Sequence, residues 1–362
     1  MNNVYGGTEQ VEYHAAERSA TRRGAEESHA APLRAAGRYA PSPSGDLHLG
    51  NLRTALLAWA YARSAGMQFI LRMEDLDERS RPQYVDSQLH DLAALGLEWD
   101  EPVLFQSQRL DRYAEIFRQL EKDGMLYECY CTRKDLAEVT RAPHRPPGSY
   151  PGTCRNLSVE QRDAGRAKLA GSGREPAFRL RTAVTTLTVT DANDGRYSGA
   201  VDDLVIKRGD GVYSYNFVSV VDDGDSGVAQ IVRGNDLLPS TPRQVYVQKL
   251  LGYPTPEYRH VPLVLNDRGV RLAKRDGAVT MGRLAAFGWQ AADVIQLLAE
   301  SLGYSESRGY GDVRSAADFL AVFEPERLAG AHCGVRGEHD GVRRPWYVDV
   351  TALEAGPRAV LG

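Results

Sequence analysis

A turn rich in Pro, Ser and Gly, followed by a lone histidine, precedes a strongly periodic segment: residues 40–50 read APSPSGDLHLG. The next residues have the spacing of one face of an amphipathic helix: Leu52, Ala55, Leu56, Trp59 and Ala60. A helix N-terminus accepts phosphate, because its first backbone N–H groups lack intrahelical partners and its dipole is positive there. Gly45 and Gly50 permit a ligand to approach the backbone, and His48 can donate to a phosphate oxygen. The alternative interpretation is a surface loop that caps a helix.

A second stretch that is a candidate for a functional role lies about 220 residues further on, where residues 270–276 read VRLAKRD. Arg271, Lys274 and Arg275 fall in one short loop after a predicted strand. By itself such a run of cations is typical of a solvated face. No GxxxxGK[ST] element accompanies either stretch, so neither belongs to a Walker-type P-loop.

Three of the four cysteines gather in one region, and Cys333 stands apart. Cys129, Cys131 and Cys154 offer three of the thiolate ligands that Zn²⁺ prefers, and the Tyr150 phenol lies near them in the sequence. An ordinary zinc site would take a fourth Cys or His, which His144 could supply; the alternative interpretation is a buried pair of cysteines. So few cysteines suit a reducing compartment rather than a disulfide scaffold, and we expect a cytoplasmic protein.

The elements that must position these groups follow an α/β order. Short apolar strands around residues 38–40 and 68–73 alternate with helices, which predicts an open sheet with right-handed crossovers. Residues 178–211 alternate with period two and contain turn signals, which predicts antiparallel hairpins. VYSYNFVSVVDD (212–223) and AQIVRG (229–234) are predicted as buried strands, residues 241–253 as a helix, and residues from about Arg283 to Leu302 as helical.

The bulk composition sets limits on the class of protein. The chain has 362 residues, 42% hydrophobic and 25% charged, with a formal net charge of −4. No run of eighteen apolar residues occurs, so we expect no membrane association. Residues 1–36 are predicted to form a poorly ordered extension.

Taken together, the motifs resemble the catalytic core of the glutamyl- and glutaminyl-tRNA synthetases, which are class I aminoacyl-tRNA synthetases. HLGN (48–51) stands where that family has HIGH, and RLAKR (271–275) stands where it has KMSKS. RYAPSPSGDLHLGNLRTAL, RMEDLD, YSYNFVSVVDD, IVRGNDLLPSTPRQ and HVPLVLNDRGVRLAKR follow in the family's order, from Gly37 to about Met281.

The resemblance implies an α/β fold: a Rossmann-like parallel sheet, an inserted antiparallel segment with a zinc site, and a C-terminal helical subdomain like a stem-contact region. It divides the chain at these expected boundaries: an extension, 1–36; the first half of the catalytic domain, 37–106; the connective insert, 107–208; the second half, 209–255; and the KMSKS-like loop with the helical subdomain, 256–362.

The same resemblance implies residue roles in a ligase that adenylates glutamate with ATP and Mg²⁺. The catalytic residues would be His48 and Lys274. The glutamate site would comprise Arg38, Tyr39, Ala40, Pro41, Ser42, Glu74, Tyr215 and Arg233. The ATP site would comprise Ser44, Gly45, His48, Gly50, Asn51 and Lys274. Arginines suit the two carboxylates of glutamate, and Glu74 suits its ammonium group.

The chain departs from the family pattern at several positions. Arg271 and Ala273 replace the first Lys and the first Ser of KMSKS, while Lys274 keeps the second Lys. Ser219 stands where the family often has Asn, which puts the contact with the α-carboxylate in question.

Two features of the sequence limit which molecule can be the acceptor of the activated glutamate. The pattern of Cys129, Cys131, Tyr150 and Cys154 resembles the zinc site of one subgroup, the glutamyl-Q tRNA(Asp) synthetases, in which Tyr is the fourth ligand. About 90 residues follow Arg275, too few for a stem-contact region and an anticodon-binding domain, because domains usually have about 100 to 150 residues.

The subgroup transfers glutamate to queuosine in the anticodon of tRNA(Asp), and we expect the same acceptor and a monomer. Two alternatives stay open: a truncated glutamyl-tRNA synthetase that charges the 3′ end of tRNA(Glu), and a catalytically silent paralogue that binds RNA or protein. Ala273 favours the silent paralogue, whereas Lys274, Glu74 and Arg233 argue against it.

Overall fold

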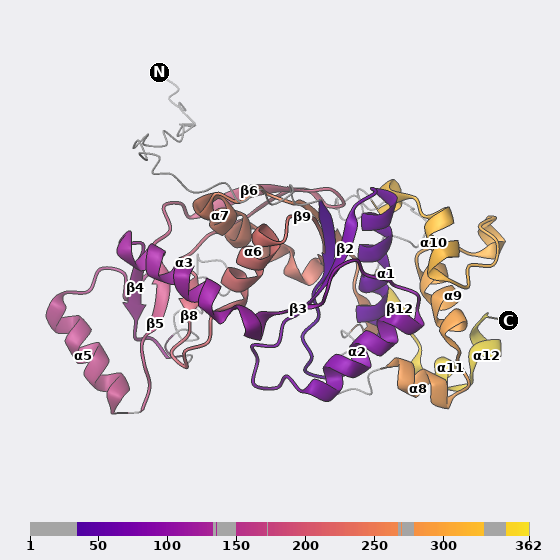
Figure 1. Cartoon of the computed structure of the whole chain (residues 1–362), viewed down its shortest axis with the longest axis horizontal. Coiled ribbons are helices and arrows are strands. Elements are labelled where there is room, and N and C mark those ends of the chain that lie inside the picture. Colours follow the sequence, from indigo (N-terminus) through magenta and orange to yellow (C-terminus); the bar gives the residue numbers. More distant parts are fainter. Residues whose placement is uncertain are drawn as a thin grey trace, which may run out of the picture. The chain divides into compact units, whose positions relative to one another are not determined.

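The computed structural model describes residues 35–132, 135, 150–171, 173–266, 269, 279–328 and 345–361, which all belong to one compact unit that begins at Arg34. Its centre is a seven-stranded sheet in the order β3-β2-β1-β9-β10-β6-β7 (Figure 1). The strands are β1 (Ala36–Tyr39), β2 (Gln68–Met73), β3 (Leu104–Phe105), β6 (Thr186–Asp191), β7 (Gly195–Ala200), β9 (Val228–Gly234) and β10 (Glu257–Val261). Neighbours pair in parallel except for the hairpin β6–β7. The predicted α/β class with a parallel sheet is confirmed.

Helices cover both faces of this sheet, which explains the near-continuous apolar strands. Phe69 and Leu71 of β2 belong to the hydrophobic cluster that includes helix α1 (Leu49–Ser64). Ile70, from the opposite face of β2, packs with Ile231 and with Val245 of helix α7 (Thr241–Leu251). Helix α2 (Pro82–Ala94) follows β2 along the chain, and helix α6 (Tyr215–Asp225) packs against α7.

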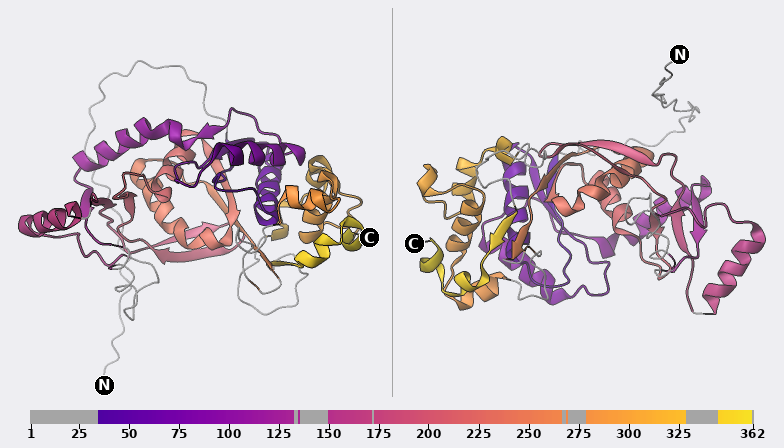
Figure 2. Two further views of the ribbon diagram at one scale, coloured as in Figure 1. Left: turned by 90° about the horizontal axis from the view of Figure 1, so that it is seen from below. Right: turned by 180° about the vertical axis from the view of Figure 1, so that it is seen from behind.

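Helix α1 is buried on nearly all sides, not on one face as its periodicity predicts. Its outer side is covered by the C-terminal helices, which lie beside it in all three views (Figure 2). Arg53 is buried there and has no acidic partner among the residues that the structure describes: its guanidinium donates to the Pro262 carbonyl, at 3.1 Å, and to Ser301. Burial lowers the pKa of Arg53 to about 10. The C-terminal helices are α8 (Met281–Ala286), α9 (Ala291–Ser301), α10 (Ala316–Val322), α11 (Val350–Glu354) and α12 (Pro357–Leu361).

A second, antiparallel sheet of three strands, in the order β4-β5-β8, carries the cysteines. Its strands are β4 (Leu126–Cys129), β5 (Ala177–Leu180) and β8 (Val205–Lys207), and the helices around it are α3 (Leu110–Lys122) and α5 (Val159–Ala170). The segment expected as one insert therefore contributes to both sheets, because the hairpin β6–β7 extends the central sheet. Strand β11 (Val264–Asn266) pairs with β12 (Trp346–Val348) in a small parallel sheet.

Two predicted elements differ from the observed ones. The run at 212–223 was expected as a strand, but it forms α6, because an unbroken apolar run fits a buried helix as well as a buried strand. The predicted helix from about Arg283 to Leu302 is split into α8 and α9 at Gly288, whose φ of 85° ends the first helix. Within the described residues, no helix has both the length and the apolar character needed to span a bilayer.

Candidate functional site

A cavity of about 660 Å³ opens at the carboxyl ends of adjacent parallel strands. Its walls come from the ends of β1 and β9 and from the residues that directly follow β2 and β10, which are Glu74 and Pro262. Open α/β sheets bind their ligands at this edge, because the loops there leave a crevice that the helices do not fill.

The cavity brings together predicted residues that lie far apart in the sequence. All eight candidates for the glutamate site line it: Arg38, Tyr39, Ala40, Pro41, Ser42, Glu74, Tyr215 and Arg233. Five of the six candidates for the ATP site also line it: Ser44, Gly45, His48, Gly50 and Asn51. The sixth, Lys274, lies outside the described residues, as do Arg271, Ala273 and Arg275.

His48 is the N-cap of α1, as the helix-capping interpretation expects, and it also lines the cavity. Its Nδ1 accepts hydrogen bonds from the backbone N–H groups of Gly50, at 3.1 Å, and Asn51, at 3.3 Å. The expectation that these N–H groups await a ligand is wrong, because the histidine already accepts from them. A neutral imidazole that accepts at Nδ1 carries its proton on Nε2, which makes Nε2 a donor.

Gly50 is required by this cap rather than by a ligand. A Cβ added at position 50 would lie 2.9 Å from Cε1 of the His48 ring, closer than carbon atoms pack. The preceding turn is held by Gln88 of α2, whose amide donates to the carbonyl oxygens of Ser42, at 3.2 Å, and Gly45, at 2.7 Å. Sequence reasoning missed Gln88, which carries no signal beyond its place in a helix.

A buried ion-pair network stands behind one end of the cavity. Asp223 of α6 accepts from Arg38, at 3.3 Å, and from Arg72 of β2, at 2.5 Å. Arg72 also donates to Glu74, at 3.1 Å. Burial by itself would raise the pKa of Asp223, but the guanidiniums of Arg72 and Arg38 outweigh it and hold that pKa below its ordinary value. Burial raises the pKa of Glu74, against the opposing effect of the same two arginines.

The network continues away from the cavity through Asp222, which is fully buried. Its carboxylate accepts from Arg109, at 2.6 Å, from Gln106, at 2.9 Å, and from the Tyr113 hydroxyl, at 2.9 Å. These residues were not predicted. The available signal was the pair of acids that ends VYSYNFVSVVDD together with an arginine inside the apolar strand QFILRM, since buried charges need partners.

Arg233 and Tyr215 reach the cavity from β9 and α6. Arg233 is 5% exposed, and each of its three nitrogens donates to a side chain: His260, Gln244 and Thr241. Tyr215 is 38% exposed. Ser219 does not line the cavity, because its hydroxyl donates to the Tyr215 carbonyl within α6, at 2.7 Å.

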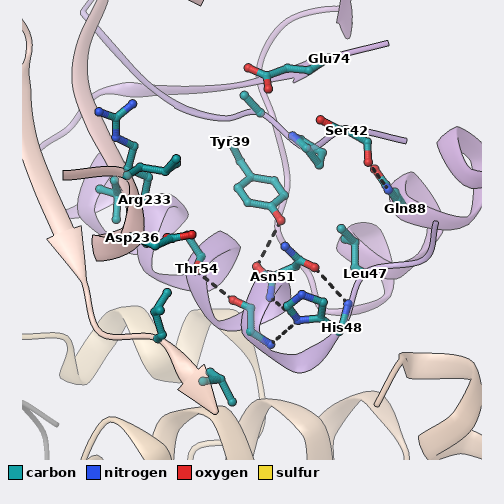
Figure 3. Close-up of a pocket in the computed structure, with 18 of the residues that line it drawn as sticks. Tyr39, Ser42, Leu47, His48, Asn51, Thr54, Glu74, Gln88, Arg233 and Asp236 are labelled. Carbon is teal, nitrogen blue, oxygen red and sulfur yellow. Dashed lines mark hydrogen bonds between the residues drawn. The ribbon is translucent and has the colours of Figure 1, made fainter. Parts of the chain in front are cut away.

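The charges in the cavity are divided between two ends (Figure 3). Glu74 and Arg233 lie toward one end, His48 and Asn51 lie toward the other, and Tyr39 stands between them with its hydroxyl donating to the Asn51 carbonyl, at 3.2 Å. Arg38, Arg233 and Glu74 at the first end complement a molecule with two carboxylates and one ammonium group, and Asp236 adds a second carboxylate to the cavity wall. The positive end of the α1 dipole and the Nε2 donor of His48 at the second end complement phosphate.

The cysteine cluster forms a second site beside strands β4 and β5. The Sγ atoms of Cys129, Cys131 and Cys154 all lie within 4.8 Å of one another. The Tyr150 hydroxyl lies 3.5 Å from the Cys129 sulfur and 4.0 Å from the Cys131 sulfur, and it accepts from the backbone N–H of Cys154. His144 and Cys333 lie outside the described residues.

Comparisons with known proteins show which family this chain resembles. The sequence model of one protein family, the catalytic domain of class I tRNA synthetases for glutamate and glutamine (E and Q), matches residues 35–308. The glutamyl-Q tRNA(Asp) synthetase of Nocardia farcinica is 55% identical over 293 residues, which are 81% of this chain and 90% of that protein. The enzyme of that name from Cutibacterium acnes is 44% identical over 84% of this chain and 86% of that protein.

Longer relatives cover the same region. Glutamate–tRNA ligase 1 of Alkalilimnicola ehrlichii is 38% identical over 80% of this chain, but the match covers only 61% of that protein. The structure of a glutamate tRNA ligase from Elizabethkingia meningosepticum in complex with its amino acid superposes with a TM-score of 0.66 at 25% identity, covering 82% of this chain and 66% of that one.

Proposed function

Because the chain belongs to the class I tRNA synthetases of the glutamate and glutamine type, and within them to the glutamyl-Q tRNA(Asp) synthetases, we propose that it adenylates L-glutamate with ATP and transfers the glutamyl group to queuosine in the anticodon of tRNA(Asp). The observation that carries the proposal is the shared cavity. One space at the carboxyl ends of the strands holds both the charge pattern that fits glutamate and, at the positive end of helix α1, the His48 donor that fits phosphate.

In the proposed complex, each end of the cavity binds one substrate. Arg38 and Arg233 pair with the carboxylates of glutamate, and the Tyr215 hydroxyl bonds to the side-chain carboxylate. Glu74, as a carboxylate, binds the ammonium group, and Arg72 and Arg38 favour that ionised form. The phosphates of ATP lie at the His48 end, where Nε2 donates to an oxygen, and the positive charge of Lys274 would contribute to the binding of the same phosphates.

The first reaction needs positioning and charge stabilisation, with no covalent enzyme intermediate. An oxygen of the glutamate α-carboxylate attacks the α-phosphorus of ATP in line, the bond to the β-phosphate oxygen breaks, and pyrophosphate leaves. Mg²⁺ that enters with ATP neutralises part of the phosphate charge. In the second reaction a hydroxyl of the queuosine cyclopentenediol attacks the glutamyl carbonyl, and AMP leaves as the ester forms.

Zinc fits the cysteine cluster. Zn–S bonds of about 2.3 Å in a tetrahedral site place ligand atoms about 3.8 Å apart. The observed separations are close to that: Cys131 and Cys154 sulfurs lie 3.6 Å apart, and the Tyr150 oxygen lies 3.5 Å from the Cys129 sulfur. Cys129, Cys131, Cys154 and Tyr150 would hold the ion, and its role would be structural, since four protein ligands leave no open position.

The decisive experiment compares tRNA pools. Labelled glutamate is offered with ATP to tRNA from queuosine-containing and from queuosine-lacking cells, and only the first pool should be labelled. Equal labelling of both pools would defeat the assignment to queuosine. A second arm removes the terminal adenosine of purified tRNA(Asp), which should leave labelling intact because the acceptor is in the anticodon.

The two alternatives give other outcomes in the same assay. A truncated glutamyl-tRNA synthetase would label tRNA(Glu) and would lose that labelling when the terminal adenosine is removed. A silent paralogue would show no glutamate-dependent exchange between ATP and pyrophosphate under any condition.

A further inference from the structure

Arg233 is held from behind by three neutral side chains. Its Nε donates to Nε2 of His260, at 3.0 Å, one terminal nitrogen donates to Gln244, at 2.6 Å, and the other donates to Thr241, at 2.8 Å. A guanidinium has five N–H donors. Three of them are used by these bonds, so one on each terminal nitrogen is left for the cavity that Arg233 lines.

The partners of Arg233 orient its charge without neutralising it. Within the described parts of the chain, no carboxylate lies within ion-pair distance of Arg233, whereas Arg38 and Arg72 both pair with Asp223. The nearest acid in its hydrogen-bond chain is Asp191, which is separated from it by the His260 ring. A ligand carboxylate would therefore be the first direct counter-ion of this buried cation.

Asp191 fixes the direction of the hydrogen bonds that connect it to His260 and connect His260 to Arg233. Its Oδ2 lies 2.6 Å from Nδ1 of His260, and the same oxygen accepts from the His260 backbone N–H. A carboxylate only accepts, so Nδ1 must carry the proton and Nε2 must be the acceptor that the Nε–H of Arg233 requires. His260 is 0% exposed and Asp191 is 1% exposed, so water does not substitute for either partner.

We propose that His260 is a positioning residue for glutamate recognition: it aims the Arg233 guanidinium into the cavity, and Asp191 sets the tautomer that lets it do so. This inference rests on the proposed function, because it assigns Arg233 to a carboxylate of glutamate. His260 itself touches no substrate, so its replacement should alter the affinity for glutamate and leave the binding of ATP alone.

Two substitutions separate the bond to Arg233 from the bond to Asp191. In His260→Asn the side-chain amide occupies the place of Nδ1, which keeps a donor for Asp191 and leaves the Nε–H of Arg233 without its acceptor. In His260→Gln the amide reaches the place of Nε2 and offers Arg233 an acceptor oxygen. The measurements are the KM for glutamate, the KM for ATP and kcat in ATP–pyrophosphate exchange, with glutamate affinity by calorimetry and the melting temperature.

The expected result is a split between the two variants. His260→Asn should raise the KM and the dissociation constant for glutamate about tenfold, with the KM for ATP within about twofold, since a lost hydrogen bond to a charged group is worth about that factor. His260→Gln should stay within about threefold of the wild type.

Other outcomes overturn the inference or the function, and they can be told apart. The positioning role would be refuted if the two variants bound glutamate with equal affinity. It would also be refuted if both lost the same glutamate affinity and both had a lowered melting temperature. A wild-type protein that binds glutamate but performs no exchange would refute the proposed function, while the two dissociation constants would still decide the role of His260. A wild type without glutamate affinity would refute both.

Discussion

The backbone N–H of Leu49 donates to the carbonyl oxygen of Val279, at 2.9 Å, and its neighbour His48 forms an antiparallel bridge with Thr280. The start of helix α1 is thereby joined to the residues that follow the cationic segment 270–278 in the sequence. Val264, which precedes that segment, lines the same cavity. Described residues on both sides of the segment thus lie at the proposed phosphate end, which is the arrangement that a role for Lys274 requires.

The two functions of His48 can be separated by substitution. Asn is a good N-cap and can accept from the helix N–H groups, but it has no donor at the position of Nε2. We expect His48→Asn to lower kcat for ATP–pyrophosphate exchange about 100-fold with little change in melting temperature, as for the loss of one donor to a developing charge. His48→Ala should lose the same activity and also about 1 kcal/mol of stability. If His48→Asn exchanged at the wild-type rate, the phosphate role would be refuted.

Asp223 should be a determinant of stability as well as of the glutamate site. Removing its carboxylate in Asp223→Ala leaves the buried guanidiniums of Arg38 and Arg72 without their shared partner, which should lower the free energy of unfolding by about 3 to 5 kcal/mol in urea denaturation. The control is Asp77→Asn, which removes an exposed ion pair with Arg79 and should leave stability nearly unchanged. Equal effects of the two substitutions would show that the network is not what stabilises this region.

The cysteine cluster predicts that the protein binds zinc and that Cys154 is required for this binding. We expect about one zinc ion per chain by elemental analysis, lost in Cys154→Ser because a hydroxyl is a poor replacement for a thiolate ligand. Cys333→Ser is the matched control, since it makes the same chemical change outside the proposed ligand set, and its zinc content should be unchanged. Wild-type zinc content in Cys154→Ser would exclude Cys154 from the site.

The sequence predicted the residues at the cavity surface better than those behind it. Residues such as His48, Glu74 and Arg233 stand at the ends of strands or at a helix start, where local pattern already places them at the edge of the sheet. The partners that orient them could not be predicted: Asp223 and His260 are brought to Arg38 and Arg233 by tertiary packing, across 185 and 27 residues of chain. The spacing of apolar residues indicates which positions are buried, but it does not indicate which buried polar side chains contact one another.

The same limit explains why the segment 212–223 was predicted as a strand although it forms a helix. Its valines are buried whether they form a strand or a helix, and its two terminal acids do not change that pattern. In the helix, Asp222 and Asp223 are adjacent and meet the arginines of β2 and β1. The ion-pair network behind the cavity thus depends on the one element whose type local pattern predicted wrongly.

The buried His260 should make the fold sensitive to mild acid. Burial lowers its pKa below the ordinary value of 6.5, against the opposing effect of the hydrogen bond that His260 donates to Asp191, and Arg233 lowers it further. Below 6.5 the unfolded chain binds a proton that the folded chain does not, so stability rises with pH between the folded pKa and 6.5 and falls on acidification through that window. The pKa of Asp191 is itself lowered, so the stability that its carboxylate contributes is lost only at pH values below 3.8.

Thermal unfolding at pH 7.5 and 5.5 tests this expectation. The wild type should lose more melting temperature on acidification than His260→Gln, which has no titrating ring at this position. Asp91, whose pKa burial raises to about 6, acts in the opposite direction, but it is present in both proteins and cancels in the comparison. Equal losses in the two proteins would mean that His260 takes up its proton in the folded state as readily as in the unfolded chain, which its contacts with Asp191 and Arg233 at 0% exposure argue against.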